Sequence, residues 1–199
     1  MINQCRTPVI LASASPRRRE ILTYLGLDFT CIPPRIKETP CPQETPLVHV
    51  RRLAKEKGEY IAGLYPGAVI ISADTIVVYD GQILGKPADK KDAFRILELL
   101  SGNTHEVITA FAITSKYCTP DILEHESTEV MFRDLHPEEI QSYINSGLPM
   151  DKAGAYGIQD LQAAFVRKIN GCYFNVTGFP VSAFLQKWNA TLPTSGKNR

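Results

Sequence analysis

The sequence predicts an α/β fold, because strand-like and helix-like segments alternate along its 199 residues. Apolar β-branched runs such as residues 68–71 are typical of central strands that are covered on both faces. Of all residues, 44% are hydrophobic and 22% are charged, which is the composition of a folded domain and not of a disordered chain. A chain of this length has room for one domain, or for two lobes that share a cleft.

The first elements follow from apolar runs and helix-start signals. Residues 9–12 form a short apolar run and predict a buried strand. The pair Ser15-Pro16 suits the N-cap and the first position of a helix. Residues 47–60 then repeat apolar side chains at helical spacing, beginning with Leu47 on the apolar face. Residues 68–71 predict the central strand that follows this helix.

Turn and cap residues place a hairpin and another helix in the middle of the chain. Asp80-Gly81 between two apolar runs predicts a β-hairpin over residues 75–84. Asp89 suits the N-cap of a helix that runs to Leu100 and that Ser101-Gly102 would end. Two strands are predicted next, over residues 107–114 and 129–132.

The last third of the chain contains two predicted helices and a second hairpin. A helix over residues 137–146 opens with proline in its first turn. Asn170-Gly171 predicts a hairpin between strands at residues 163–169 and 172–176. A helix over residues 180–188 closes the fold, and the polar tail, residues 193–199, is expected to be disordered.

Charge and cysteine content limit the classes of function. The 22 lysines and arginines nearly balance the 21 acidic residues, so no nucleic-acid or anionic-membrane partner is expected. The five cysteines are irregularly spaced and form no CxxC pair, which argues against a disulfide framework or a structural zinc site. The N-terminal apolar run is too short for a signal peptide, and no stretch is long enough for a membrane span. We therefore expect a cytoplasmic protein.

The segment SASPRRR, residues 13–19, combines a helix start with three arginines. The positive end of the helix dipole lies there, so cations in this turn are unfavourable unless an anion binds. Backbone N–H groups and guanidinium groups could then converge on one phosphate. The alternative is a solvated basic turn. Of the three arginines, Arg19 lies further round the turn and is the one most expected to be merely exposed.

Asp74 directly follows the predicted central strand. A carboxylate at the end of a buried strand is costly unless it is hydrogen-bonded, paired or bound to a metal. In α/β sheets the carboxyl ends of the strands are where ligands bind. Asp74 is therefore a candidate metal ligand or general base, and a turn-forming aspartate is the alternative.

Four further polar residues are weaker candidates. Lys86 is not part of a Walker A loop, because only three residues separate the preceding glycines and a proline follows, but it could contact a phosphate from a loop. Lys57 could equally be a surface charge on its helix, and Glu38 stands in a proline-rich loop. Gln159 ends a loop with two glycines and could present a donor and an acceptor to a nucleobase, with a surface amide as the alternative.

Four stretches together resemble the Maf family. They are SASPRRRE from Ser13, ADTIV from Ala73 with Gly85-Lys86-Pro87, LLSG from Leu99 with THEV from Thr104, and DKAGAYGIQ from Asp151. They occur in family order, and the resemblance covers about residues 8–190 of a single domain that spans residues 1–199. It implies a mixed twisted sheet with flanking helices and two lobes around a deep cleft, related to the inosine triphosphate pyrophosphatases.

The activity that this resemblance implies is hydrolysis of a nucleoside triphosphate to the monophosphate and pyrophosphate. The DKAGAYGIQ loop and the following FVRKING stretch are similar to the branch that acts on dTTP and UTP. Asp74 matches the family's proton acceptor, and the positions tied to substrate choice are Arg17, Thr75 and Gln159. The residues expected to bind phosphate are Ser13, Ser15, Arg17, Arg18, Lys57 and Lys86. The sequence departs from the family's pattern at two places. Ser72 stands where glycine is common, and the segment after Gln159 is less rich in glycine.

A divalent cation, Mg²⁺ or Mn²⁺, is the expected cofactor, with Glu38 and Asp74 holding it directly or through water. The expected partner is a nucleoside triphosphate, and a homodimer is left open. Two alternatives remain at this point. One is a pyrophosphatase for other modified nucleotides such as 7-methyl-GTP, and the other is a non-catalytic nucleotide-binding regulator of cell division.

Overall fold

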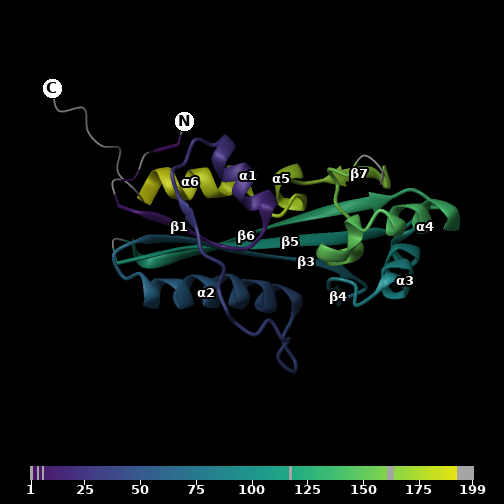
Figure 1. The fold of residues 1–199 in the computed structure, drawn as a ribbon, viewed down its shortest axis with the longest axis horizontal. Coiled ribbons are helices and arrows are strands. Elements are labelled where there is room, and N and C mark those ends of the chain that lie inside the picture. The colour runs from purple at the N-terminus through teal and green to yellow at the C-terminus, as the bar shows by residue number, and fades with distance from the viewer. Residues whose placement is uncertain (1, 4, 6, 117, 161–163, 192–199) are drawn as a thin grey trace. The chain divides into compact units, whose positions relative to one another are not determined.

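The structure, a computed structural model, describes residues 2–3, 5, 7–116, 118–160 and 164–191 (Figure 1). The predicted disorder of residues 193–199 therefore concerns residues outside the described part of the chain. The chain divides into two compact units, each assembled from separate segments. The first unit comprises Met1–Asp74, Thr109–Glu126 and Gly178–Arg199, and the second comprises Thr75–Ile108 and Ser127–Thr177.

Within the described residues, seven strands form one sheet. Its strand pairing is mixed, as predicted. They are β1 (Val9–Ala12), β2 (Thr30–Cys31), β3 (Val69–Tyr79), β4 (Gln82–Leu84), β5 (Thr104–Ser115), β6 (Cys118–Phe132) and β7 (Val166–Asn170). Their order is β2-β1-β3-β5-β6-β7, with β4 paired to β3. The pairs of β1 with β2 and β3 are parallel, whereas β3–β4 and β6–β7 are antiparallel.

In the first unit, helices cover both faces of the sheet. Figure 1 shows α2 (Pro46–Leu64) below the strands, and α1 (Pro16–Tyr24) and α6 (Val181–Thr191) above them. Successive residues of β1 point to opposite faces, so Leu11 packs in the core that includes Trp188 of α6, and Ile10 packs in the core that includes Ile61 of α2. This two-sided cover explains why every residue of β1 is buried.

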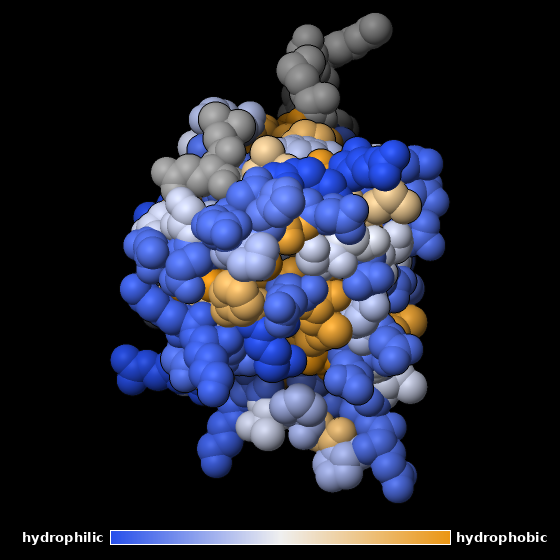
Figure 2. All heavy atoms as spheres, turned by 90° about the vertical axis from the view of Figure 1, so that its right-hand side faces the viewer, coloured by the Kyte–Doolittle hydropathy of each residue, from blue (hydrophilic) through white to orange (hydrophobic). Residues whose placement is uncertain are grey.

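The second unit has its own hydrophobic core under α3 (Lys90–Leu100) and α4 (Pro137–Asn145). Asp89 caps α3 as predicted, since its side chain accepts a hydrogen bond from the N–H of Asp92 at 2.8 Å. Short helical segments complete this unit: η1 (Leu148–Asp151), η2 (Ala153–Ala155) and α5 (Tyr173–Val176). Figure 2 views the face that carries α3 and α4, where hydrophilic residues surround a small hydrophobic area.

Most of the predicted elements are confirmed. The first strand, the helix that begins after Ser15 and the helices α2, α3, α4 and α6 occur within a few residues of their expected bounds. The β3–β4 hairpin turns at Asp80 and Gly81, whose φ angles of 47° and 72° are the left-handed values that this turn requires. Among the described helices, none is long and apolar enough to cross a bilayer.

Three predictions about local structure are wrong. Residues 172–176 do not form a hairpin strand, because Tyr173–Val176 is the helix α5. Its Asn175 is fully buried and donates to the Val107 carbonyl at 2.8 Å and to Thr128 Oγ1 at 2.9 Å, which ties this helix to two strands. Leu47 was expected on the apolar face of α2 but is exposed.

The third wrong prediction concerns the length of the central strand. β3 does not end at Ile71 but continues to Tyr79, so Asp74 lies inside a strand and not at its carboxyl end. Strands β5 and β6 are also longer than predicted, and β6 begins at Cys118 instead of near residue 129. Polar residues interrupt the apolar runs of these strands, so the apolar pattern alone underestimates their length.

Candidate functional site

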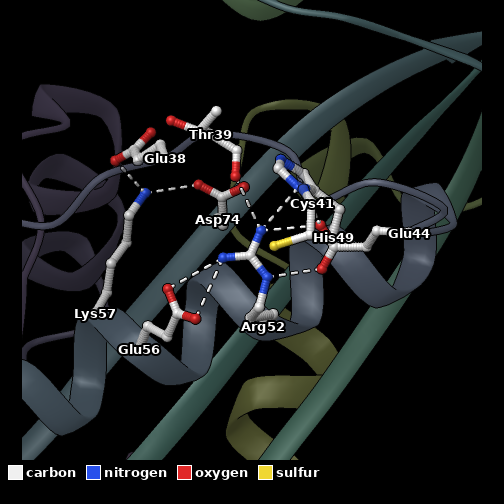
Figure 3. A network of polar contacts seen from close by, with 9 residues as sticks. All are labelled: Glu38, Thr39, Cys41, Glu44, His49, Arg52, Glu56, Lys57 and Asp74. Carbon is white, nitrogen blue, oxygen red and sulfur yellow. Dashed lines mark hydrogen bonds and ion pairs between the residues drawn. The ribbon is translucent and has the colours of Figure 1, made fainter.

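A buried lysine and two carboxylates form the centre of the candidate site in the first unit. The Lys57 ammonium donates to Asp74 Oδ1 at 2.6 Å and lies 2.8 Å from Glu38 Oε1 (Figure 3). The side chains of Lys57 and Asp74 are only 8% and 10% exposed, whereas that of Glu38 is 54% exposed. The interpretation of Lys57 as a surface charge is therefore wrong, and Asp74 is an ion-paired residue rather than a turn former.

Close packing of α2 on β3 brings Lys57 to Asp74. Ser72 Oγ donates to the Ala54 carbonyl at 2.7 Å, which fastens the helix to the strand. A Cβ atom on Gly58 would lie 2.8 Å from Ser72 Oγ, so only glycine allows this approach. Ser72 thus has a structural role in the contact between α2 and β3.

The arginines at the start of α1 differ in their surroundings. Arg18 is buried, and its guanidinium donates to the Gly178 carbonyl at 2.9 Å, the Ala73 carbonyl at 2.8 Å and Ser13 Oγ at 3.3 Å. Burial lowers the pKa of Arg18 below its ordinary value, and the negative charge of Asp74 opposes that shift. Arg18 is thereby fixed beside the backbone of β3, one residue before Asp74.

The start of α1 has the geometry of an anion site. Ser15 is the N-cap and accepts from the N–H of Arg18 at 3.5 Å, while its own N–H donates to Ser13 Oγ at 3.1 Å. Arg17 is half-buried in this turn, and Arg19 is exposed, as expected. Positive helix-dipole potential and at least one guanidinium are thus combined at one helix end, which suits a phosphate.

Glu38 and Asp74 form a donor set that fits a divalent cation shared with a substrate. Their oxygens Oε1 and Oδ1 converge on a single cationic group, the Lys57 ammonium. In the described part of the chain there is no group of three or more His, Cys, Asp or Glu residues that could hold a metal by themselves. Mg²⁺ typically binds one or two carboxylates and completes its shell with water and substrate phosphates. This open two-carboxylate arrangement matches that behaviour.

The remaining predicted site residues belong to the second unit. Thr75 follows Asp74 in β3 and is half-buried, Lys86 is exposed in the loop after β4, and Gln159 is exposed in a turn. The loop before Gln159 is tightly held, because Gly154 adopts a φ of 69° and a Cβ there would lie 2.8 Å from Val77 Cγ2. Gly154 thus allows the loop to pack closely against Val77.

Sequence reasoning missed a polar network beside the two carboxylates (Figure 3). Arg52 of α2 donates to both carboxylate oxygens of Glu44, at 2.7 and 2.9 Å, to both of Glu56 and to the Thr39 carbonyl. His49 Nδ1 also lies 3.0 Å from the Glu44 carboxylate. The spacing of Arg52 and Glu56 signals a helical ion pair, but nothing in the sequence connects either residue to Glu44.

Comparison with known proteins gives a consistent family assignment. The family described as Maf-like protein matches residues 8–190. A protein of Syntrophomonas wolfei named dTTP/UTP pyrophosphatase is 50% identical over 172 residues, which cover 86% of this chain and 91% of that protein. Proteins of the same name from Geobacter sp. strain M21 and Aquifex aeolicus are 49% and 46% identical, each over 87% of this chain and 90% of their own length. The matched region includes every candidate site residue, and the chain therefore belongs to the Maf family.

Proposed function

We propose that this protein is a nucleoside triphosphate pyrophosphatase that hydrolyses dTTP and UTP, and modified pyrimidine nucleotides, to the monophosphate and pyrophosphate. The observation that carries the proposal is the buried Lys57–Asp74 pair with Glu38 beside it. Binding alone requires no buried carboxylate next to a phosphate site, whereas hydrolysis requires a base and counter-charges. The names of relatives that match 86–87% of the chain support the same reaction and the same nucleobases.

In the proposed reaction, Asp74 orients a water molecule and accepts its proton as the oxygen attacks the α phosphorus. The new bond joins the water oxygen to this phosphorus, and the bond to the oxygen that bridges the α and β phosphates breaks. The electron pair of the broken bond leaves with pyrophosphate. Lys57 holds Asp74 Oδ1 at 2.6 Å, which leaves the second oxygen of the carboxylate to receive the water.

Positive groups balance the charge of the substrate and of the leaving group. Arg17, with the N-terminus of α1, would bind phosphate oxygens, and Lys86 would add a further positive charge. Arg18 is held by three neutral oxygen acceptors and contributes its charge at that helix end. Glu38 and Asp74 are the residues that would hold a divalent cation, which when bound supplies further charge neutralisation for the phosphates.

Three residues are proposed to decide which nucleobase is accepted: Arg17, Thr75 and Gln159. Gln159 has one amide donor group and one acceptor, which can pair with the edge of thymine or uracil. Exchange of Gln159 for leucine should raise KM for dTTP and UTP and leave the cleavage position unchanged, because the phosphate-binding residues are unaltered. The half-buried Thr75 and Arg17 are the next positions to vary.

The cytoplasm is the proposed compartment of this activity. Four cysteines, Cys5, Cys31, Cys41 and Cys172, are free thiols, which is usual for proteins of a reducing compartment. Nucleoside triphosphates also serve as substrates there.

The proposal is tested by incubating the protein and Mg²⁺ or Mn²⁺ with separate nucleotides, followed by analysis of the products. The panel comprises dTTP, UTP, CTP, ITP, 7-methyl-GTP, 5-methyl-UTP and pseudo-UTP. Monophosphate and pyrophosphate should form fastest from the uracil and thymine nucleotides. Asp74→Asn should lower kcat about 100-fold or more, and the control Glu59→Gln, which changes an exposed carboxylate of α2, should retain activity.

Three results would contradict parts of this proposal. Near-normal kcat in Asp74→Asn would show that Asp74 is not the proton acceptor. The same products, but fastest from 7-methyl-GTP or ITP, would overturn the base preference and keep the chemistry. If the protein bound nucleotides but hydrolysed none of the panel, it would be a non-catalytic regulator and not an enzyme.

A further inference from the structure

The position of Glu38 depends on a loop without regular structure. Residues 33–40, all within the described part of the chain, form neither helix nor strand. Prolines at 33, 34 and 40 remove backbone donors from this segment, so a ladder of backbone hydrogen bonds cannot fix it. The Glu38 side chain is more than half exposed, which gives it little packing of its own. Its carboxylate pairs with Lys57 at 2.8 Å, and contacts elsewhere along the loop position the backbone from which it extends.

Arg52 of α2 makes those contacts. Its Nη2 group donates to the carbonyl of Thr39, the residue next to Glu38, at 3.2 Å. Its Nε and Nη2 groups bind the two oxygens of Glu44 at 2.7 and 2.9 Å, and Glu44 in turn accepts from the N–H of Cys41 at 3.1 Å. Figure 3 shows the guanidinium between the helix and the loop, facing Thr39 and Glu44 at once. One side chain thus fastens the loop at two points that follow Glu38.

The geometry and burial of this pair favour a rigid attachment. A two-pronged contact between guanidinium and carboxylate fixes orientation as well as distance, which a lysine cannot do. The Glu44 side chain is 5% exposed, and that of Arg52 is 24% exposed. Hydrogen bonds from Arg52 lower the pKa of Glu44 to about 2, so the pair stays ionised at the pH of an ordinary assay. Glu56 binds the remaining edge of the guanidinium at 3.1 and 3.2 Å and holds it in place.

We propose that Arg52 and Glu44 are positioning residues, which hold the loop so that the Glu38 carboxylate stays beside Lys57 and Asp74. The functional part of this inference rests on the proposed role of Glu38 in holding a divalent cation. A cation site with two protein carboxylates loses much of its affinity when one of them is displaced, and loss of a supporting residue typically weakens metal affinity 10- to 100-fold. Arg52 and Glu44 contribute through Glu38 and do not contact the substrate themselves.

The experiment compares Arg52→Gln and Glu44→Gln with wild type, and Lys55→Gln is the matched control. Lys55 is a cation of the same helix, but it is 55% exposed and pairs with Glu59. The first readout is NMR hydrogen exchange of the Cys41 amide, which reports attachment of the loop without any ligand. The second is the dissociation constant of Mn²⁺ without nucleotide, measured from the electron paramagnetic resonance signal of free Mn²⁺.

The expected results are specific. Cys41 should exchange faster in both network variants and at the wild-type rate in Lys55→Gln. Mn²⁺ should bind about 10-fold more weakly in Arg52→Gln. In a Glu38→Gln background, Arg52→Gln should cause no further loss of Mn²⁺ affinity, because Arg52 affects Mn²⁺ binding only through Glu38. Arg52→Lys keeps the charge and should give intermediate exchange, which provides a second variant if Arg52→Gln does not fold.

The results that overturn the inference differ from those that overturn the proposed function. Unchanged exchange of Cys41 in Arg52→Gln and Arg52→Lys would show that the pair does not fasten the loop. A tenfold loss of Mn²⁺ affinity that persists in the Glu38→Gln background would show that Arg52 acts by another route. Wild-type Mn²⁺ affinity in Glu38→Gln would instead refute the cation-holding role of Glu38, while the exchange rates would still decide whether Arg52 positions the loop.

Discussion

His105 should make the protein less stable in mildly acidic solution. It lies in β5, is 3% exposed, and shares a hydrogen bond of 2.8 Å between its Nε2 and the Tyr156 hydroxyl. Phe132 packs against its ring with centroids 5.0 Å apart. Among the described residues, Nδ1 has no hydrogen-bond partner. Burial lowers the pKa of His105 from 6.5 to about 4, so the folded protein holds this imidazole neutral.

The sign and size of the effect follow from these two pKa values. Below pH 6.5 the unfolded chain binds a proton at His105 that the folded chain does not bind, so the free energy of unfolding falls. The stabilisation associated with neutral His105 is fully present in the free energy of unfolding above pH 6.5, and it is lost progressively towards pH 4. Between pH 7 and pH 5 the loss amounts to about 2 kcal/mol, from 1.36 kcal/mol for each pKa unit.

The assay is urea unfolding followed by circular dichroism at pH 7, 6 and 5, for wild type and for His105→Gln. Glutamine can keep the hydrogen bond with Tyr156 because its amide nitrogen reaches about as far as Nε2, but it does not titrate. Other groups titrate alike in both proteins, so the difference between their pH dependences isolates His105. Between pH 7 and pH 5, the free energy of unfolding of the variant should fall by about 2 kcal/mol less than that of wild type. Equal losses in the two proteins would refute the reasoning, as would an NMR titration that places the pKa of His105 near 6.5.

Three further predictions concern packing and capping. Gly58→Ala should destabilise the protein by about 1–3 kcal/mol, because its Cβ would lie 2.8 Å from Ser72 Oγ, and Ser72→Gly in the same chain should restore part of the loss in a urea titration. Gly154→Ala should cost at least about 1–2 kcal/mol in the same measurement, since its φ is 69°, and an unchanged midpoint would contradict the assigned backbone conformation. Glu139→Gln should lower the free energy of unfolding at pH 7 by about 0.5–1 kcal/mol, because glutamine can keep the cap hydrogen bond of α4 but loses the charge that pairs with Arg133. Hydrogen bonds from Arg133 lower the pKa of Glu139 to about 2, so wild-type stability should fall from pH 4.5 towards pH 2 and the variant should fall less.

Elements that depend on neighbouring residues in the chain were predictable from the sequence. Ser15 and Asp89 cap their helices because a side-chain oxygen needs to reach only three residues along the backbone. The turn at Asp80-Gly81 was predictable because its left-handed φ angles suit those two residue types. The resemblance to the Maf family also led us to expect Asp74, Lys57 and Glu38 in the site, although it did not indicate how they contact one another.

The contacts of the site were decided by tertiary structure. Nothing near Lys57 in the sequence indicates that the residue is buried, because its partner Asp74 comes from β3 and the close approach depends on Gly58 packing against Ser72. The failed prediction at residues 172–176 has the same origin. The Asn175 side chain donates hydrogen bonds to Val107 and Thr128, which belong to strands far away in the sequence.

The attachment of the Glu38 loop was likewise invisible in the sequence. Glu44 and Arg52 are eight positions apart, and only the course of the proline-rich loop back onto α2 brings their charges together. Local preferences therefore determined the helices, turns and family motifs of this protein. Burial and long-range pairing, which depend on the whole chain having folded, determined which of its charged side chains meet.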